Sequence, residues 1–146
     1  MERRNNGRSK FTPRTIKKVL DALRIGAPVG TAVGAAGLHH TTWDEWVADG
    51  SELADALARA NELDDVVQVF DRWMADHAEA LTPVEPPQFA RAALAVAYHR
   101  AKEEAVLGYV AAIRGAARDD WRAAAWWLER RRPEDFGGVS LSLIHI

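Results

Sequence analysis

Positively charged side chains crowd the first two dozen residues, and their chemistry is that of phosphate binding. Residues 1–24 contain eight Lys and Arg against two acidic residues, in a chain whose net charge is −2. Cationic side chains neutralise nucleic-acid phosphates and release counterions without regard to base sequence. The alternative is a solvated basic tail. We expect these residues to contact DNA: Arg3, Arg4, Arg8, Lys10, Arg14, Lys17 and Lys18.

A second candidate lies in residues 28–49, whose spacing predicts two short helices joined by a tight turn. Gly37 can take the positive φ that the turn needs, and Leu38 would fill the corner. Trp43 and Trp46, three residues apart, would face inward. This pattern is typical of a helix-turn-helix, whose second helix lies in the DNA major groove; the alternative is an ordinary three-helix bundle. The residues expected to point into the groove are His40, Thr41, Asp44 and Glu45.

Spacings that indicate an enzyme are missing from the sequence. It contains no G-x-x-x-x-G-K-[ST] phosphate loop, which argues against ATP hydrolysis. His39 and His40 are adjacent and cannot easily share one metal ion, and the chain has no cysteine. We therefore expect a protein that is not an enzyme and that uses no metal and no cofactor.

Helix signals run along the whole chain, so we predict an all-α protein. Thr12 followed by Pro13 marks a helix start, and Gly26 marks its end. Pro28 would open the second helix, and the third would end near Gly50. The predicted parts are a flexible basic arm (1–11), a helix-turn-helix domain (12–50), an acidic helical segment (51–81), a proline-rich linker (82–87), a long helix with a C-terminal helix (88–137), and a disordered or artefactual tail (138–146).

The long helix, expected over residues 88–118, carries two apolar stripes. Two stripes require neighbours on more than one side, and oligomerisation would cover one of them. Asp119 or Asp120 would cap the last helix. The oligomerisation residues predicted on this basis are Leu94, Tyr98, Ala101, Ala105, Val106, Val110 and Ile113. The predicted structural core comprises Gly37, Leu38, Trp43, Trp46, Trp121, Ala125 and Leu128.

Charge and hydropathy restrict the cellular location of the protein. Residues 43–81 hold eleven acidic residues against two basic ones, which contrasts with the basic N-terminus. No segment has the length and hydrophobicity of a membrane span, and the N-terminus is not a signal peptide. We expect a cytoplasmic protein that makes no membrane contact. The alternating residues Leu141–Ile146 match what a transposon-based sequencing adaptor would encode, so they are not assigned to the predicted fold.

The C-terminal segment DDWRAAAWWLERRRPEDFG, Asp119–Gly137, follows a helix ending AAIRGAA. It closely resembles the C-terminal part of small terminase subunits of tailed double-stranded DNA bacteriophages and prophages, where a similar W-R-A-A-x-W-L-L-E-R-R-x-P segment occurs. Phe11–Gly50 resembles the N-terminal helix-turn-helix of the same group. Two features depart from the family: the acidic segment resembles an insertion, and Asp44 and Glu45 stand where basic or neutral residues are commoner.

The resemblance implies a DNA-binding protein that recognises phage DNA at the start of genome packaging, in the host bacterial cytoplasm. Its implied partners are double-stranded DNA, further copies of itself in a ring, and the large terminase subunit, whose ATPase and nuclease it regulates. One alternative is a dimeric helix-turn-helix transcriptional regulator or a transposase-type DNA-binding subunit on palindromic half-sites. A second is a helical adaptor whose acidic helices bind a protein.

Overall fold

The computed structural model describes residues 10–131, apart from the side chains of Ala124, Trp127 and Arg131. Every regular element in this range is an α-helix, which confirms the all-α prediction. The chain divides after Ala105 into two compact units. The helices are α2 (Pro13–Arg24), α3 (Val29–Ala35), α4 (His40–Arg59), α5 (Leu63–Asp76), α6 (Ala90–Ala117) and α7 (Trp121–Arg131).

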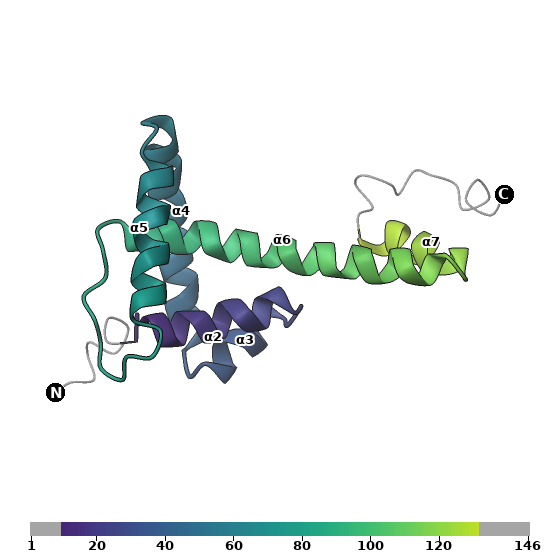
Figure 1. The fold of residues 1–146 in the computed structure, drawn as a ribbon, viewed down its shortest axis with the longest axis horizontal. Helices are drawn as coiled ribbons and strands as arrows, with labels where there is room; N and C mark the ends of the chain where they lie inside the picture. The colour runs from purple at the N-terminus through teal and green to yellow at the C-terminus, as the bar shows by residue number, and fades with distance from the viewer. Residues whose placement is uncertain (1–9, 132–146) are drawn as a thin grey trace. The chain divides into compact units, whose positions relative to one another are not determined.

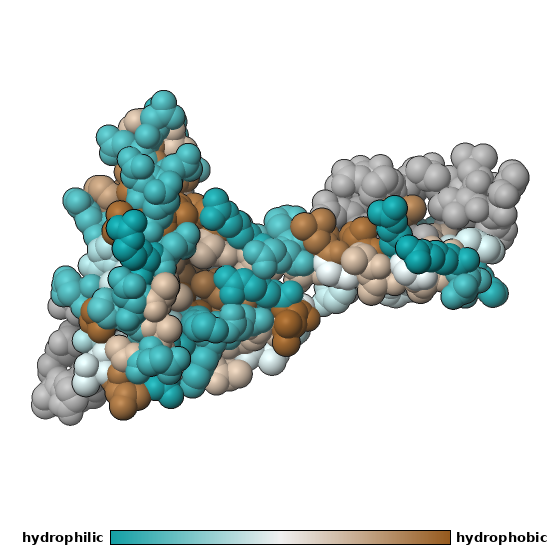
Figure 2. Space-filling model, viewed as in Figure 1, coloured by the Kyte–Doolittle hydropathy of each residue, from teal (hydrophilic) through white to brown (hydrophobic). Residues whose placement is uncertain are grey.

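The first unit is built around the long helix α4. Helices α4 and α5 lie side by side, and α2 and α3 pack together at one end of that pair (Figure 1). The first part of α6 packs against the same core, to which it contributes Ala93, Leu94 and Ala101. On the face seen in Figure 2, hydrophilic residues predominate over the α4–α5 pair. One apolar core therefore joins helices that are far apart in the sequence, and Ala54, Leu57 and Ala92 form a second, smaller cluster.

The three turns that join α2 to α5 share one hydrogen-bonding pattern. At the end of α3, the N–H of Leu38 donates to the carbonyl of Val33 (3.1 Å) and that of Gly37 to Gly34 (3.0 Å). Gly37 has a φ of 83°, so the turn is a Schellman motif, in which the left-handed residue closes the helix. The same pattern closes α2 at Gly26 (φ 99°) and α4 at Asn61 (φ 62°).

Aromatic rings fill the centre of the first unit. Trp43 has no exposed surface; its ring centroid lies 6.1 Å from that of Trp46 and 5.9 Å from that of Tyr98 on α6. Phe11 packs edge-on against Trp46 at 4.8 Å and is stacked on Trp73 of α5 at 6.1 Å. Removing a buried ring of this size typically costs about 3–5 kcal/mol. The inner face of α4 thus holds α5, α6 and the start of α2 together.

Gly50 lies against the backbone of α6, and its role differs from the sequence prediction. The sequence predicts that the third helix ends there and that a separate acidic segment starts at residue 51, but α4 continues to Arg59. A Cβ on Gly50 would collide with the backbone carbonyl of Arg91, so this glycine lets two helices cross in contact. The predicted boundary at residue 50 therefore falls inside a helix, and residues on both sides of it share one core.

Two other predicted boundaries also shift. The acidic helical segment is predicted to reach residue 81, but α5 ends at Asp76 and residues 77–89 are not helical. The basic arm is predicted to reach residue 11, but Phe11 is only 6% exposed. The aromatic contacts of Phe11 place it in the folded unit. The helix start at Thr12 and Pro13 is confirmed, because the Thr12 hydroxyl accepts from the Thr15 N–H at 3.2 Å.

The second unit contains the C-terminal part of α6 and helix α7. The carboxylate of Asp120 accepts hydrogen bonds from the side chain and the backbone N–H of Arg122, both at 3.0 Å. These bonds and the charge of Arg122 hold the pKa of Asp120 below its usual value. The expected acidic cap of the last helix is therefore present at Asp120. Several large apolar side chains stay exposed here, among them Leu107 (65%) and Trp126 (51%).

Replacing Gly50 by Ala tests the close crossing of α4 and α6. The added methyl group must displace the Arg91 backbone, and overpacking of this kind costs about 1–3 kcal/mol of unfolding free energy. Gly34→Ala is the matched control, because a Cβ there meets nothing within 4 Å and helical Ala is favoured over Gly by about 0.5–1 kcal/mol. Urea unfolding measures both variants. Equal stability of the two would contradict the crossing.

Candidate nucleic-acid interface

The N-terminal half of α4 presents an exposed polar face. The four residues predicted to point into a DNA groove are all exposed, whereas Trp43 and Trp46 are buried on the opposite side of the helix. Ala48 continues the exposed face one turn further on. The structure therefore brings together, on one surface, the predicted contacts His40, Thr41, Asp44 and Glu45.

Two histidines order the start of this face. His39 is the N-cap of α4, and its Nδ1 atom lies 3.3 Å from the backbone nitrogen and 2.8 Å from the hydroxyl oxygen of Thr41. His40 Nδ1 lies 2.8 Å from Asp44 Oδ2, one turn along the helix. Asp44 is thus already engaged within the helix, and Glu45 is the second carboxylate of the surface.

Positive charge reaches this face from the chain that precedes α2. The ammonium group of Lys10 donates to the carbonyl of Gly37 at 3.2 Å, in the turn between α3 and α4. On α2, Arg14, Lys17 and Lys18 are exposed, as predicted contacts must be. Lys17 also pairs with Asp21 at 2.7 Å, so part of its charge is compensated. The remaining predicted contacts, Arg3, Arg4 and Arg8, lie outside the described residues.

The predicted oligomerisation residues fall into two groups. Leu94 and Ala101 have no exposed surface and belong to the core of the first unit, so their predicted role at a subunit interface is wrong. Tyr98 packs on the same core, and Ala105 is buried. The residues that remain accessible in the second unit are Val106, Val110 and Ile113, of which Val110 is exposed and the other two are half-buried.

The predicted structural core is correct at Leu38, Trp43 and Trp46, wrong at the exposed Gly37, and mixed on α7. Leu38, Trp43 and Trp46 are buried, and Gly37 occupies the left-handed turn. On α7, Ala125 is buried and Leu128 is half-buried, but Trp121 is 38% exposed and is not a core residue.

The predicted structural core omits the buried rings of Phe11, Phe70 and Trp73, of which Phe11 and Trp73 stack on each other. A signal for Phe11 exists, because a hydrophobic residue directly before a helix cap often packs back onto that helix. Trp73 lies on the buried face of α5 beside Phe70. Both rings belong to the aromatic centre that keeps the opposite face of α4 exposed.

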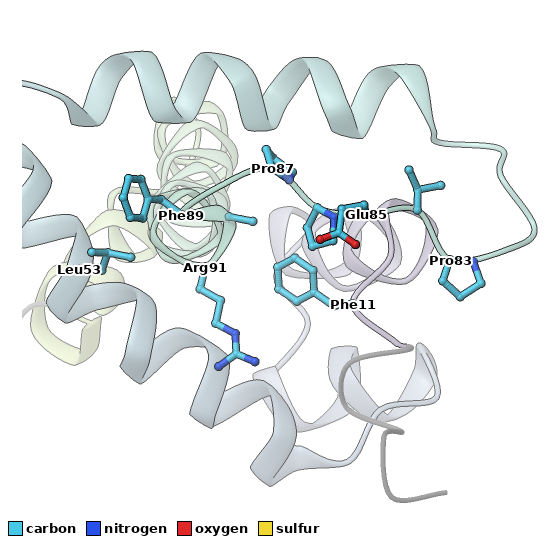
Figure 3. A pocket seen from close by; sticks show the side chains of 10 residues that line it. Phe11, Leu53, Pro83, Glu85, Pro87, Phe89 and Arg91 are labelled. Carbon is cyan, nitrogen blue, oxygen red and sulfur yellow. The ribbon is translucent and has the colours of Figure 1, made fainter. Parts of the chain in front are cut away.

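A groove of about 690 Å³ lies beside the non-helical segment 77–89. Its walls are mostly apolar, with Phe11, Leu53 and Phe89 near the proline-rich segment (Figure 3). Its two charged side chains are Glu85 and Arg91, and Arg91 donates to Asp49 at 2.8 Å. No pair of groups in the groove is arranged for acid–base chemistry. The predicted linker at 82–87 thus forms a groove wall on the first unit.

Residues 10–131 give no support for a metal site or a membrane-spanning helix. No group of three or more His, Asp or Glu side chains in this range is arranged to hold a metal ion. None of the described helices combines the length and the hydrophobicity that crossing a membrane requires. Searches of protein-family models, curated proteins and solved structures gave no match to this chain. The exposed face of α4 and the basic residues near it are therefore the strongest candidate site.

The N-cap at His39 can be tested by substitution. His39→Ala removes the acceptor for the Thr41 N–H, which typically costs about 0.5–2 kcal/mol of unfolding free energy. His39→Asn supplies another good capping side chain and should retain wild-type stability. Thermal unfolding followed by circular dichroism distinguishes the two. A stable Ala variant would show that the imidazole contributes nothing to the cap.

Proposed function

We propose that this protein binds double-stranded DNA through a helix-turn-helix formed by α3 and α4, as a small terminase subunit that starts phage genome packaging. The observation that carries the proposal is the geometry of the turn and of α4. Gly37 closes α3 in the left-handed conformation, Trp43 and Trp46 face the core, and the opposite side of α4 is exposed. In a helix-turn-helix, that exposed side of the second helix enters the major groove.

The residue types on the exposed face of α4 favour base recognition by this face and phosphate binding by other residues. His40 and Thr41 can hydrogen-bond to base edges, and the Glu45 carboxylate can accept from cytosine N4. Acidic side chains add no phosphate affinity, so the affinity comes from the cationic residues around α2 and before it. The Asp44 carboxylate lies 2.8 Å from His40 Nδ1, so it has a partner on its own helix.

The second unit supports self-association as part of the same proposal. A helix pair of this size cannot enclose a core, and its large exposed apolar residues need a covering surface. These residues include Leu107, Val110 and Trp126. In the proposed role, copies of the chain associate through this unit into a ring that presents DNA to the large terminase subunit and regulates its ATPase and nuclease.

DNA binding is tested by the salt dependence of affinity. The full chain should bind a short duplex with an affinity that falls steeply as salt rises. Replacing Arg14, Lys17 and Lys18 by Ala should reduce the slope of log K against log salt by roughly 1 for each phosphate that is no longer neutralised. Fluorescence anisotropy with labelled duplex measures the slope.

The matched control removes equal charge from the same unit. Arg59, Arg72 and Arg100 are exposed on α4, α5 and α6, and their joint replacement by Ala should leave the slope unchanged. An equal reduction of the slope in both triple variants would point to net charge alone. Salt-insensitive or absent binding by the unmodified chain would favour the protein-binding adaptor.

The mass of the native assembly in solution distinguishes a role in genome packaging from that of a transcriptional regulator. A closed assembly larger than a tetramer supports the terminase proposal, whereas a dimer supports a transcriptional regulator or a transposase-type subunit on palindromic half-sites. Val110→Asp with Leu107→Asp places charge on the exposed apolar surface of the second unit and should shift the mass to that of the monomer. Native mass spectrometry or light scattering of the full chain measures both results.

A further inference from the structure

The exposed face at the start of α4 is made of groups that accept hydrogen bonds. Two of its four residues, Asp44 and Glu45, are carboxylates, which only accept when they are ionised. No hydrogen bond or ion pair within residues 10–131 engages the Glu45 carboxylate, and this residue is exposed. The hydrogen-bonding roles of the other two residues, His40 and Thr41, follow from their neighbours in the helix.

The Asp44 carboxylate determines which nitrogen of His40 carries the hydrogen. Nδ1 of His40 lies 2.8 Å from Asp44 Oδ2, and a carboxylate oxygen can only accept, so Nδ1 is the donor. In the neutral imidazole the second ring nitrogen, Nε2, then holds a lone pair. The exposed His40 side chain therefore offers an acceptor.

His39 orients the hydroxyl group of Thr41. As the N-cap of α4, its Nδ1 atom accepts the backbone N–H of Thr41 at 3.3 Å, so this nitrogen carries no hydrogen. The Thr41 hydroxyl oxygen lies 2.8 Å from the same nitrogen and must be the donor in that contact. Because its hydrogen is used there, the hydroxyl oxygen has only lone pairs left for a ligand. All four exposed groups of the face are therefore acceptors.

A face of acceptors is complementary to amino groups in the major groove, which are N4 of cytosine and N6 of adenine. Adenine N6 lies beside the N7 acceptor of the same base, which repels a carboxylate. Cytosine N4 is the only hydrogen-bonding group on the cytosine edge. Guanine and thymine present acceptors, and the four residues of this face include neither Lys nor Arg to meet them. Cytosine is therefore the base that fits this face best.

We propose that the exposed face of α4 selects cytosine by accepting from its N4 amino group in the major groove. Glu45 makes the direct contact, and Thr41 and His40 are further acceptors for neighbouring bases. This inference rests on the proposed DNA-binding function and adds the base that the face selects. Acceptors also repel phosphate oxygens, so the face lies at the bases while the cationic residues on α2 meet the DNA backbone.

Two base analogues test the proposal, because they alter opposite sides of a G·C pair. N4-methylcytosine still pairs but has a methyl group in place of the amino hydrogen in the major groove, and 7-deazaguanine lacks the N7 acceptor. The probe is the duplex that the full chain selects from a random-sequence library at about pH 8, above the range in which imidazole ordinarily titrates. The selected site should contain fixed G·C pairs. In competition anisotropy at fixed salt, N4-methylcytosine should weaken binding several-fold, and 7-deazaguanine should leave it unchanged.

Glu45→Ala assigns the contact to one side chain. Removing a negative charge by itself favours DNA binding, so weaker binding of the unmodified duplex by this variant reports a lost contact. The variant should also bind the unmodified and the N4-methylcytosine duplexes with more nearly equal affinity. Asp71→Ala is the matched control, because it removes the same charge from an exposed position on α5. It should keep the several-fold preference for unmodified cytosine.

The outcomes separate this inference from the proposed function. A selected site without G·C pairs, or no preferred sequence at all, overturns the inference while DNA binding stands. Weaker binding with 7-deazaguanine and not with N4-methylcytosine also overturns it, because the protein then reads guanine. The same holds if Glu45→Ala keeps the full preference for unmodified cytosine. If the chain retains no duplex from the library, the proposed function itself fails.

Discussion

Burial of the inner face of α4 is the constraint on which the first unit depends. Trp46 packs on Phe11, which is stacked on Trp73 of α5, and Trp43 packs on Tyr98 of α6. These rings come from four separate segments, and α4 is the segment that the others surround. The polar face of α4 is exposed because the opposite face is occupied by these rings. The candidate interface is therefore a consequence of the core.

Local sequence signals correctly predict the structure where it depends only on neighbouring residues. The Thr12 cap and the glycine turns at Gly26 and Gly37 are predicted and confirmed. Each depends on φ or on a hydrogen bond between near neighbours. These signals place α2, α3 and the start of α4, and with them the exposed residues of the candidate site.

The sequence predictions are wrong where the structure depends on a contact with a residue far away in the chain. Gly50 is a residue type that often ends helices, but here it allows close contact with the backbone of Arg91, 41 positions further on (50 to 91). Leu94 and Ala101 have the spacing of a buried helix face. Helical periodicity shows that such a face is buried, but it does not show whether the partner is the same chain or another copy. Phe11 follows a basic run, and its contact with Trp73 could not be inferred from the cap beside it.

The uninterrupted course of α4 through Gly50 has a mechanical consequence. At 20 residues the helix is about 30 Å long, and its exposed polar face lies on the first half while α5 packs along the helix. No hinge separates the two halves, since the helix continues past the glycine to Arg59. A single continuous helix therefore connects the exposed polar face to the turn at Asn61, where α4 ends.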